Sequence, residues 1–255
     1  RKAVRSWDLR ASAVMKIVVV TVPLPFMSGG DDMSTIALLD ELRQRGCECE
    51  IVTIPFKWYP PERILDCMLM ARLVDVEEVN GRKIDRVIAM KFPAYFAAHS
   101  NKVAWIMHQH RQAYDLYGTA YSDLWQAEDG RQIATEIKRW DDAFIPEHRA
   151  LFTISKTVTR RLEHFNGLAG EALYHPPFHQ SEFHTDRWDN YILYPGRFDA
   201  LKRQHLLFEA FAHVSDNIQL VLCGPSDSVY GSELRENIER SPYRSRVRVL
   251  GNVSE

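Results

Sequence analysis

Residues 16–22 read KIVVVTV, a nearly unbroken run of β-branched side chains. A strand with one face in water alternates apolar and polar residues, whereas a parallel strand covered on both faces is apolar throughout. The run therefore predicts a buried strand of a parallel sheet. Residues 33–45 carry apolar side chains at helical spacing and are followed by Gly46, which predicts a helix that ends there.

The same alternation of strand and helix continues along the chain. We predict strands at 49–54, 84–90, 103–107, 151–154 and 172–174, and helices at 60–74, 132–144 and 156–165. Residues 109–130 lack a clear period and predict a long surface loop. Strands that alternate with helices indicate a doubly wound, mostly parallel sheet. Ligands of such sheets bind beyond the carboxyl ends of the strands, so a site is expected at those positions.

A break in the pattern divides the chain. Residues 175–190 contain two prolines, three histidines and mixed charge, which is typical of a linker. Beyond it we predict strands at 191–194, 218–223 and 246–250 and helices at 203–214 and 232–239. The predicted fold is α/β: an extension at 1–14, expected to be disordered, a complete Rossmann-like domain at 15–180, a linker at 181–190, and part of a second Rossmann-like domain at 191–255.

Composition restricts the class of protein. The 255 residues include 45% hydrophobic and 26% charged side chains, as in soluble globular proteins, and the net charge of −2 gives no reason to expect nucleic acid as a partner. No apolar run is long enough to predict a transmembrane helix. The four cysteines form no C-x-x-C pair, which favours reduced thiols and a cytoplasmic location.

The loop after the first strand, PLPFMSGGDD at 23–32, is the first candidate site. Gly29 and Gly30 precede a helix whose free N–H groups suit an anion or a hydroxyl. The alternative is a tight turn with Asp31 or Asp32 as the helix cap. The loop is not G-x-G-x-x-G, and an acidic residue does not end the second strand. Both observations count against a nicotinamide-dependent oxidoreductase.

The second candidate is YILYPGRFDALK at 191–202. Gly196 and Arg197 follow a strand, and Lys202 lies near the start of a helix. Arginine offers a planar fork of donors and lysine a compact charge, so the pair suits a diphosphate. A surface loop with solvated charges is the alternative.

Histidines form the third candidate. His108, His110 and Arg111 follow the strand at 103–107, at its ligand-facing end. Structural histidines are the alternative, and H-x-H without a third nearby ligand is a weak metal signal. The linker histidines are irregularly spaced, so we expect no metal at His175, His179 and His184.

Taken together, these segments resemble the family 4 retaining glycosyltransferases of the GT-B fold, in a bacterial surface-polysaccharide form. The segment YILYPGRFDALKRQHLLFEAFA is similar to the family's "GR…K" signature, and KVAWIMHQHRQAYDLYGT to a stretch common in its polysaccharide members. The resemblance runs from Met15 to the end of the sequence. It is carried by the opening strand and glycine loop at 16–32 and by the segments 45–53, 102–119, 191–212, 218–227 and 247–255.

The resemblance implies a role for each matching position. Arg197 and Lys202 would bind the donor diphosphate and stabilise the departing nucleotide, and His108 would contact the donor sugar. The resemblance also places His110 and Arg111 on the acceptor side. Other donor contacts would come from Gly29, Gly30, Gly196, Gly224, Asn252 and Val253. Because Arg197 and Lys202 would replace a divalent cation, no metal or other cofactor is expected.

The resemblance also implies partners. These are a nucleotide-sugar donor and a glycan or lipid-linked acceptor, with acceptor recognition in the loops at 55–75 and 109–130 and, for a lipid-linked acceptor, contact with the inner face of the membrane. The family's second domain continues with two glutamates and further helices that are missing here. We therefore expect this chain to bind donor weakly and turn over poorly. A non-catalytic module that binds nucleotide or glycan is the alternative.

Overall fold

The computed structural model describes residues 14–24, 29–177 and 179–253. The chain divides into two compact units, residues 1–182 and 183–255. The predicted extension at 1–14 lies outside the described residues except for Val14. Among the described helices, none has the length and apolar character needed to span a membrane.

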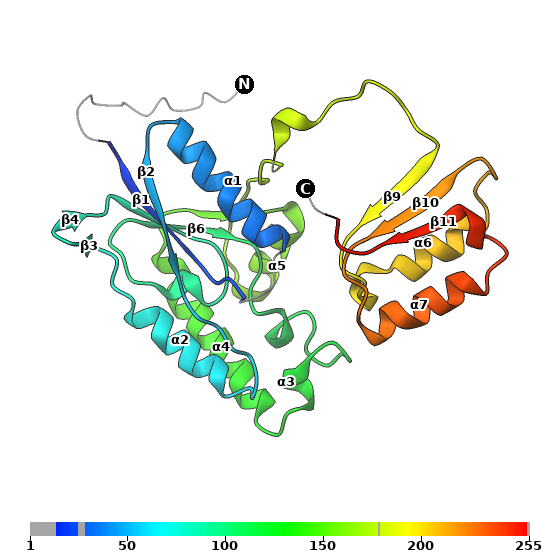
Figure 1. Cartoon of the computed structure of the whole chain (residues 1–255). Helices are drawn as coiled ribbons and strands as arrows, with labels where there is room; N and C mark the ends of the chain where they lie inside the picture. Colours follow the sequence, from blue (N-terminus) through cyan, green and yellow to red (C-terminus); the bar gives the residue numbers. More distant parts are fainter. Residues whose placement is uncertain (1–13, 25–28, 178, 254–255) are drawn as a thin grey trace. The chain divides into compact units, whose positions relative to one another are not determined.

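The first unit is built on a six-stranded sheet in the order β2-β1-β5-β6-β7-β8, in which all neighbours are parallel (Figure 1). From β1 the sheet grows to one side through β2 and to the other through β5, so the topological switch point lies between β1 and β5. The strands are β1 (Lys16–Thr21), β2 (Glu48–Thr53), β5 (Arg86–Ala89), β6 (Lys102–Ile106), β7 (Leu151–Thr153) and β8 (Glu171–Ala172).

Helices cover both faces of this sheet. Alternate residues of β1 point to opposite faces: Val18 and Val20 join the core formed with α2, α4 and α5, while Ile17 and Val19 join the core formed with α1. The prediction of a strand buried on both faces is confirmed. The helices are α1 (Gly30–Gln44), α2 (Arg63–Leu73), α4 (Gly130–Phe144) and α5 (Lys156–Asn166).

Gly46 ends α1 as predicted. Its φ of 80° is readily adopted only by glycine, and its N–H donates to the carbonyl of Arg43 at 2.9 Å. The next N–H, of Cys47, donates to the carbonyl of Leu42 at 3.1 Å. These two bonds satisfy carbonyls that the helix end would otherwise leave unpaired.

Two features of the first unit differ from the sequence prediction. A short hairpin, β3 (Glu78–Val79) and β4 (Arg82–Lys83), was not predicted. The loop predicted at 109–130 contains the 3₁₀ turn η2 (Arg111–Ala113) and the helix α3 (Asp123–Gln126). Because Tyr114 and Leu124 are buried in the core, the prediction that this whole segment is a surface loop is wrong.

The second unit has a three-stranded parallel sheet in the order β11-β10-β9. Its elements are β9 (Tyr191–Pro195), α6 (Gln204–Phe211), β10 (Gln219–Cys223), α7 (Val229–Glu239) and β11 (Val247–Leu250). Phe198, Phe211 and Leu222 are among the buried residues of the core, which packs the two helices on one face of the sheet. On the other face Tyr191 and Leu193 are exposed.

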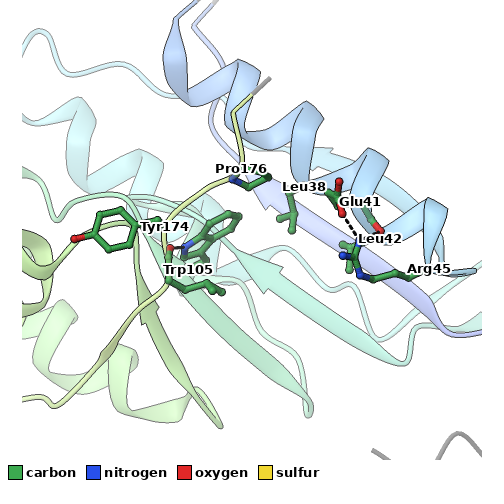
Figure 2. A pocket seen from close by; sticks show the side chains of 8 residues that line it. Leu38, Glu41, Leu42, Arg45, Trp105, Tyr174 and Pro176 are labelled. Carbon is green, nitrogen blue, oxygen red and sulfur yellow. Dashed lines mark hydrogen bonds and ion pairs between the residues drawn. The ribbon is translucent and has the colours of Figure 1, made fainter. Parts of the chain in front are cut away.

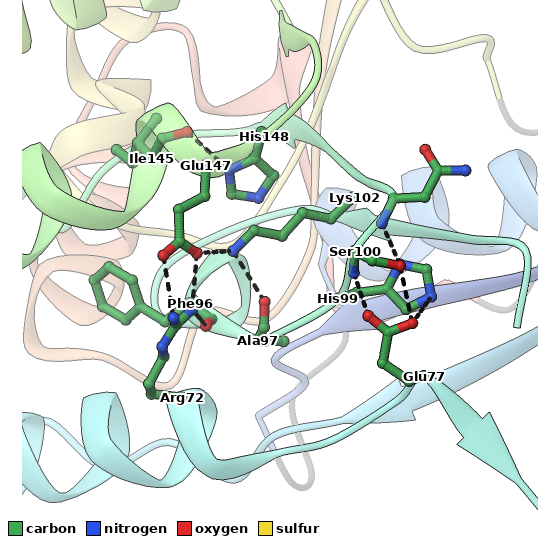
Figure 3. Close-up of polar contacts among 11 residues, drawn as sticks. Arg72, Glu77, Phe96, Ala97, His99, Ser100, Lys102, Ile145, Glu147 and His148 are labelled. Atoms are coloured by element: carbon green, nitrogen blue, oxygen red, sulfur yellow. Dashed lines mark hydrogen bonds and ion pairs between the residues drawn. The ribbon is translucent and has the colours of Figure 1, made fainter.

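An ion-pair network lies at the amino end of β6 (Figure 3). Lys102 is only 2% exposed, and its Nζ donates to the Ala97 carbonyl at 3.1 Å and to a Glu147 carboxylate oxygen at 2.8 Å. Arg72 donates to both oxygens of Glu147, at 2.8 and 3.0 Å. Burial lowers the pKa of Lys102, and Glu147 opposes this effect. The network lies at the opposite end of the strand from the ligand-binding edge, so its role is structural.

Replacing Glu147 by glutamine should destabilise the protein, because it leaves the buried ammonium of Lys102 without a counter-charge. We expect Glu147→Gln to lower the free energy of unfolding by about 3 kcal/mol in urea denaturation. In the double variant Lys102→Met with Glu147→Gln, no buried charge remains, so much of this loss should be recovered. Equal losses in the single and double variants would contradict the interpretation.

Candidate functional site

The carboxyl edge of the first sheet brings several predicted residues together. Gly29 is the N-cap of α1 and Gly30 is its first residue; residues 25–28 of the predicted loop lie outside the described residues. The carboxylate of Asp32 accepts a hydrogen bond from the N–H of Gly29 at 3.1 Å. Asp32 thus fixes the start of the helix from its third position, rather than as the cap residue that the alternative sequence interpretation proposed.

Lys91 is a residue of this edge that sequence reasoning missed. It follows β5 at the switch point, is only 9% exposed, and forms an ion pair with Asp31 at the start of α1. Burial raises the pKa of Asp31, but the hydrogen bond and charge of Lys91 outweigh burial, so the pKa is lowered. A charged residue directly after a buried strand was the signal that could have identified it.

His108 lies exposed just beyond the end of β6. Its Nδ1 is 2.7 Å from the carbonyl oxygen of Gln109. Desolvation lowers the pKa of His108, the Gln109 carbonyl opposes this, and the cations of Lys91 and Arg111 lower the pKa further. The ring is therefore neutral at pH 7 and suited to exchange hydrogen bonds with an uncharged hydroxyl.

The two residues predicted on the acceptor side are both held by the protein. The ring of His110 is buried against Phe56 and Phe92, with ring centroids 6.0 and 5.0 Å away, and burial lowers its pKa to about 4. Arg111 donates to Asp115, at 2.7 Å for its closest contact. Their acceptor-side role stays a prediction, and the packing of His110 favours a structural one.

A buried carboxylate lies behind the loop that carries these residues. Asp141 of α4 accepts hydrogen bonds from the hydroxyls of Tyr95 at 2.8 Å and Tyr114 at 2.7 Å. Complete burial raises the pKa of Asp141 to about 7 despite these two bonds. Tyr114 is itself buried in the core, whereas Tyr121 and Trp125 of the same segment are exposed.

In the second unit, glycines bring the strand ends together. Gly224 has a φ of 133°, and a Cβ at this position would lie 2.3 Å from the carbonyl oxygen of Gly196. Its N–H donates to the Gly251 carbonyl at 3.1 Å, and the N–H of Gly196 donates to the Cys223 carbonyl at 2.8 Å. The predicted glycines therefore join the carboxyl ends of β9, β10 and β11 through the backbone.

Arg197 and Lys202 lie on the loop between β9 and α6. The Arg197 carbonyl accepts a bond from the buried Gln204 side chain at 2.9 Å, while its guanidinium, with 55% of the side chain exposed, lies 3.3 Å from Asp199. Lys202 closes the 3₁₀ turn η5 (Ala200–Lys202), in which Asp199 accepts from the Leu201 N–H at 2.9 Å. The loop backbone is thus fixed, while both cations are exposed to solvent.

The last two predicted donor-binding residues, Asn252 and Val253, follow β11 at the same edge and are exposed. Within residues 14–24, 29–177 and 179–253, no three His, Cys, Asp or Glu side chains are grouped as metal ligands would be. The expectation that the reaction needs no metal stays a prediction.

A hollow of about 570 Å³ lies on the α1 face of the first sheet (Figure 2). Leu38 and Leu42 of α1, Trp105 of β6 and the segment after β8 line it. The charged groups in its wall, Glu41 and Arg45, are paired with each other. It offers a mainly apolar surface, so we do not include it in the candidate site.

Known proteins resemble this chain in sequence over its second unit and in fold over most of its length. Residues 178–255 match the family described as glycosyl transferases group 1, and no curated protein sequence matches the chain. Three similar solved structures are the lipopolysaccharide outer core galactosyltransferase WaaB in its apo form, Anabaena Alr3699/HepE in complex with UDP and glucose, and the catalytic domain of starch synthase IV from Arabidopsis thaliana bound to ADP and acarbose.

These likenesses concern the fold. The sequence identities are 15%, 16% and 11%, and the TM-scores 0.58, 0.55 and 0.59, respectively. The matches cover 94%, 94% and 95% of this chain, and 69%, 70% and 75% of the other chains. The predicted α/β fold of the GT-B kind is confirmed.

The close approach at Gly224 gives a stability prediction. Gly224→Ala places a Cβ against the Gly196 backbone at a φ that alanine rarely adopts, so we expect a loss of about 2 kcal/mol or more in unfolding free energy. The matched control is Gly251→Ala, because nothing lies within 4 Å of a Cβ there. Similar thermal unfolding of the two variants would show that the strand ends are not packed as described.

The raised pKa of Asp141 predicts that the free energy of unfolding depends on pH. Its pKa is about 7 in the folded protein against an ordinary 3.8, so its stabilising contribution is present at low pH and is lost as the pH rises toward 7. Asp141→Asn stays neutral throughout. The unfolding free energy of Asp141→Asn, measured relative to that of the wild type, should therefore increase from about pH 4 to about pH 7. A pH-independent difference would contradict the assignment; the buried His110 and His148 are shared by both proteins and cancel.

Proposed function

We propose that this protein is a retaining glycosyltransferase that moves a sugar from a nucleoside-diphosphate sugar to a glycan or lipid-linked acceptor. The observation that carries the proposal is the loop after β9. It places Arg197 and Lys202 on a fixed backbone beside the Gly196–Gly224 contact, within the stretch that matches glycosyl transferases group 1.

The chemistry of this loop suits a diphosphate. The Arg197 guanidinium can donate two parallel hydrogen bonds to phosphate oxygens, and the Lys202 ammonium adds a compact positive charge. Negative charge develops on the diphosphate as the bond to the sugar breaks, and fixed cations stabilise that charge most in the transition state. Two cations in this position take the role of a divalent metal, so we propose a reaction without one.

The donor class has support from the structural neighbours. Alr3699/HepE is described in complexes with UDP and with UDP-glucose, and starch synthase IV with ADP. We infer that the ligand of the second unit here is likewise a nucleoside diphosphate that carries a sugar. The neutral ring of His108 would contact a hydroxyl of that sugar.

Retention is proposed through attack on the face from which the nucleotide leaves. The acceptor oxygen bonds to the anomeric carbon, the bond from that carbon to the diphosphate oxygen breaks, and the departing phosphate takes the acceptor's proton. This route needs no carboxylate nucleophile. The resemblance of residues 102–119 to surface-polysaccharide enzymes supports a place in bacterial polysaccharide synthesis, on the cytoplasmic side of the membrane.

Nucleotide binding tests this proposal directly. In calorimetric titrations with UDP and GDP we expect one of them to bind, and Arg197→Ala to weaken that binding about tenfold or more, because a charge-assisted contact is lost. The matched control is Arg240→Ala, which removes another exposed, ion-paired arginine of the second unit and should leave the affinity unchanged.

Equal effects of Arg197→Ala and Arg240→Ala would contradict the proposed diphosphate site, as would the absence of binding by either nucleotide. Transfer is then measured as release of the nucleoside diphosphate from UDP-glucose or GDP-mannose with the whole protein. Nucleotide binding without any release would instead favour a non-catalytic binding module.

A further inference from the structure

The orientation of the His108 ring depends on one backbone carbonyl. Its Nδ1 lies 2.7 Å from the oxygen of Gln109, and a carbonyl oxygen can only accept a hydrogen bond. In the neutral ring Nδ1 must therefore carry the proton, and Nε2 is left with a lone pair. An imidazole in this state can accept a hydrogen bond from a hydroxyl, and the position of the Gln109 peptide decides where Nε2 points.

Gln109 is itself held by a side chain. It is only 2% exposed, and its Nε2 donates to Oδ1 of Asn166 at 2.8 Å. Asn166 is the last residue of α5, and its Nδ2 donates to Asp142 at 2.7 Å and to the hydroxyl of Tyr114 at 3.3 Å. Both ends of the Asn166 amide thus have partners of the right type, which fixes the side chain against rotation.

Tyr114 connects this row to the core. Its hydroxyl accepts from Asn166 and donates to Asp141 at 2.7 Å. Tyr95 donates to the other oxygen of the same carboxylate at 2.8 Å. The two buried tyrosines therefore make equivalent bonds to one acceptor, and only Tyr114 is also bonded to Asn166.

We propose that Tyr114 and Asn166 are positioning residues for His108, and that the row Asp141–Tyr114–Asn166–Gln109 presents Nε2 as the acceptor for one hydroxyl of the donor sugar. This inference rests on the proposed function, because it takes the ligand of His108 to be a sugar. Tyr114 and Asn166 act through Gln109, and the row helps to determine which sugar is accepted.

The proposed effect is geometric and leaves the surrounding charges in place. The charged and titratable groups that face His108 are Asp31 at the start of α1, Lys91 after β5, and His110 and Arg111 on its own loop. None of these is changed by Tyr114→Phe or Asn166→Ala. A change in the tautomer of His108 would therefore report on the hydrogen-bonded row.

Nitrogen NMR of the His108 ring tests the positioning role without any substrate. With the signals assigned by their loss in His108→Asn, we expect the wild type and Tyr95→Phe to show the proton on Nδ1. Tyr114→Phe and Asn166→Ala should show a mixture of tautomers. Asn166 is half-buried at a helix end, so its variant provides the test if Tyr114→Phe fails to fold. An unchanged tautomer in a folded Tyr114→Phe or Asn166→Ala would overturn the proposal.

Ligand binding tests the consequence for the sugar. We compare UDP with UDP-glucose, and GDP with GDP-mannose. Tyr114→Phe should reduce by about tenfold the extra affinity that the sugar provides, while the affinity for the bare nucleotide stays unchanged. Tyr95→Phe should leave both unchanged. If neither nucleotide binds, the proposed function fails, whereas the tautomer measurement still decides the role of Tyr114 and Asn166.

Discussion

Parallel pairing of the strands is the constraint on which both candidate sites depend. In each of these two sheets all the carboxyl ends lie at one edge. Helices cover both faces of the first sheet and one face of the second, so polar side chains that follow the strands meet at the carboxyl edge. In the first unit this brings Lys91 and His108 to the carboxyl edge of the sheet. In the second it brings the loop with Arg197 to the turn at Gly224. The positions of these residues follow from the strand order rather than from their closeness in sequence.

The carboxyl edges of the two sheets differ in their charged groups, and so they suit different kinds of ligand. At the carboxyl edge of the first sheet the buried ammonium of Lys91 is paired with Asp31, and desolvation keeps the rings of His108 and His110 neutral. This edge is suited to hydroxyl groups. In the second unit two cations are exposed on a backbone that glycines and hydrogen bonds hold in place, which is suited to a charged ligand.

The sequence correctly predicted features that depend on residues close together in the chain. The buried strand at 16–22 and the helix end at Gly46 depend on neighbouring residues, and both were found in the structure. The hairpin at 78–83 was missed although Asn80 and Gly81, with φ of 52° and 72°, form the turn for which Asn-Gly is the usual signal. Asp141 and Lys102 gave no such signal, because their burial depends on partners up to 46 residues away, and so the hydrogen-bonded row behind His108 was not predicted.

Mapping of the nucleotide site by amide chemical shifts is the most direct test of the central claim, that the carboxyl edge of the second sheet binds a nucleoside diphosphate. With isotope-labelled protein titrated with UDP and then GDP, the account predicts that the nucleotide that binds shifts the amide signals of 196–202, Gly224 and 251–253. Shifts confined to the amino end of the first sheet around Lys102, or to the hollow beside Trp105, would contradict it.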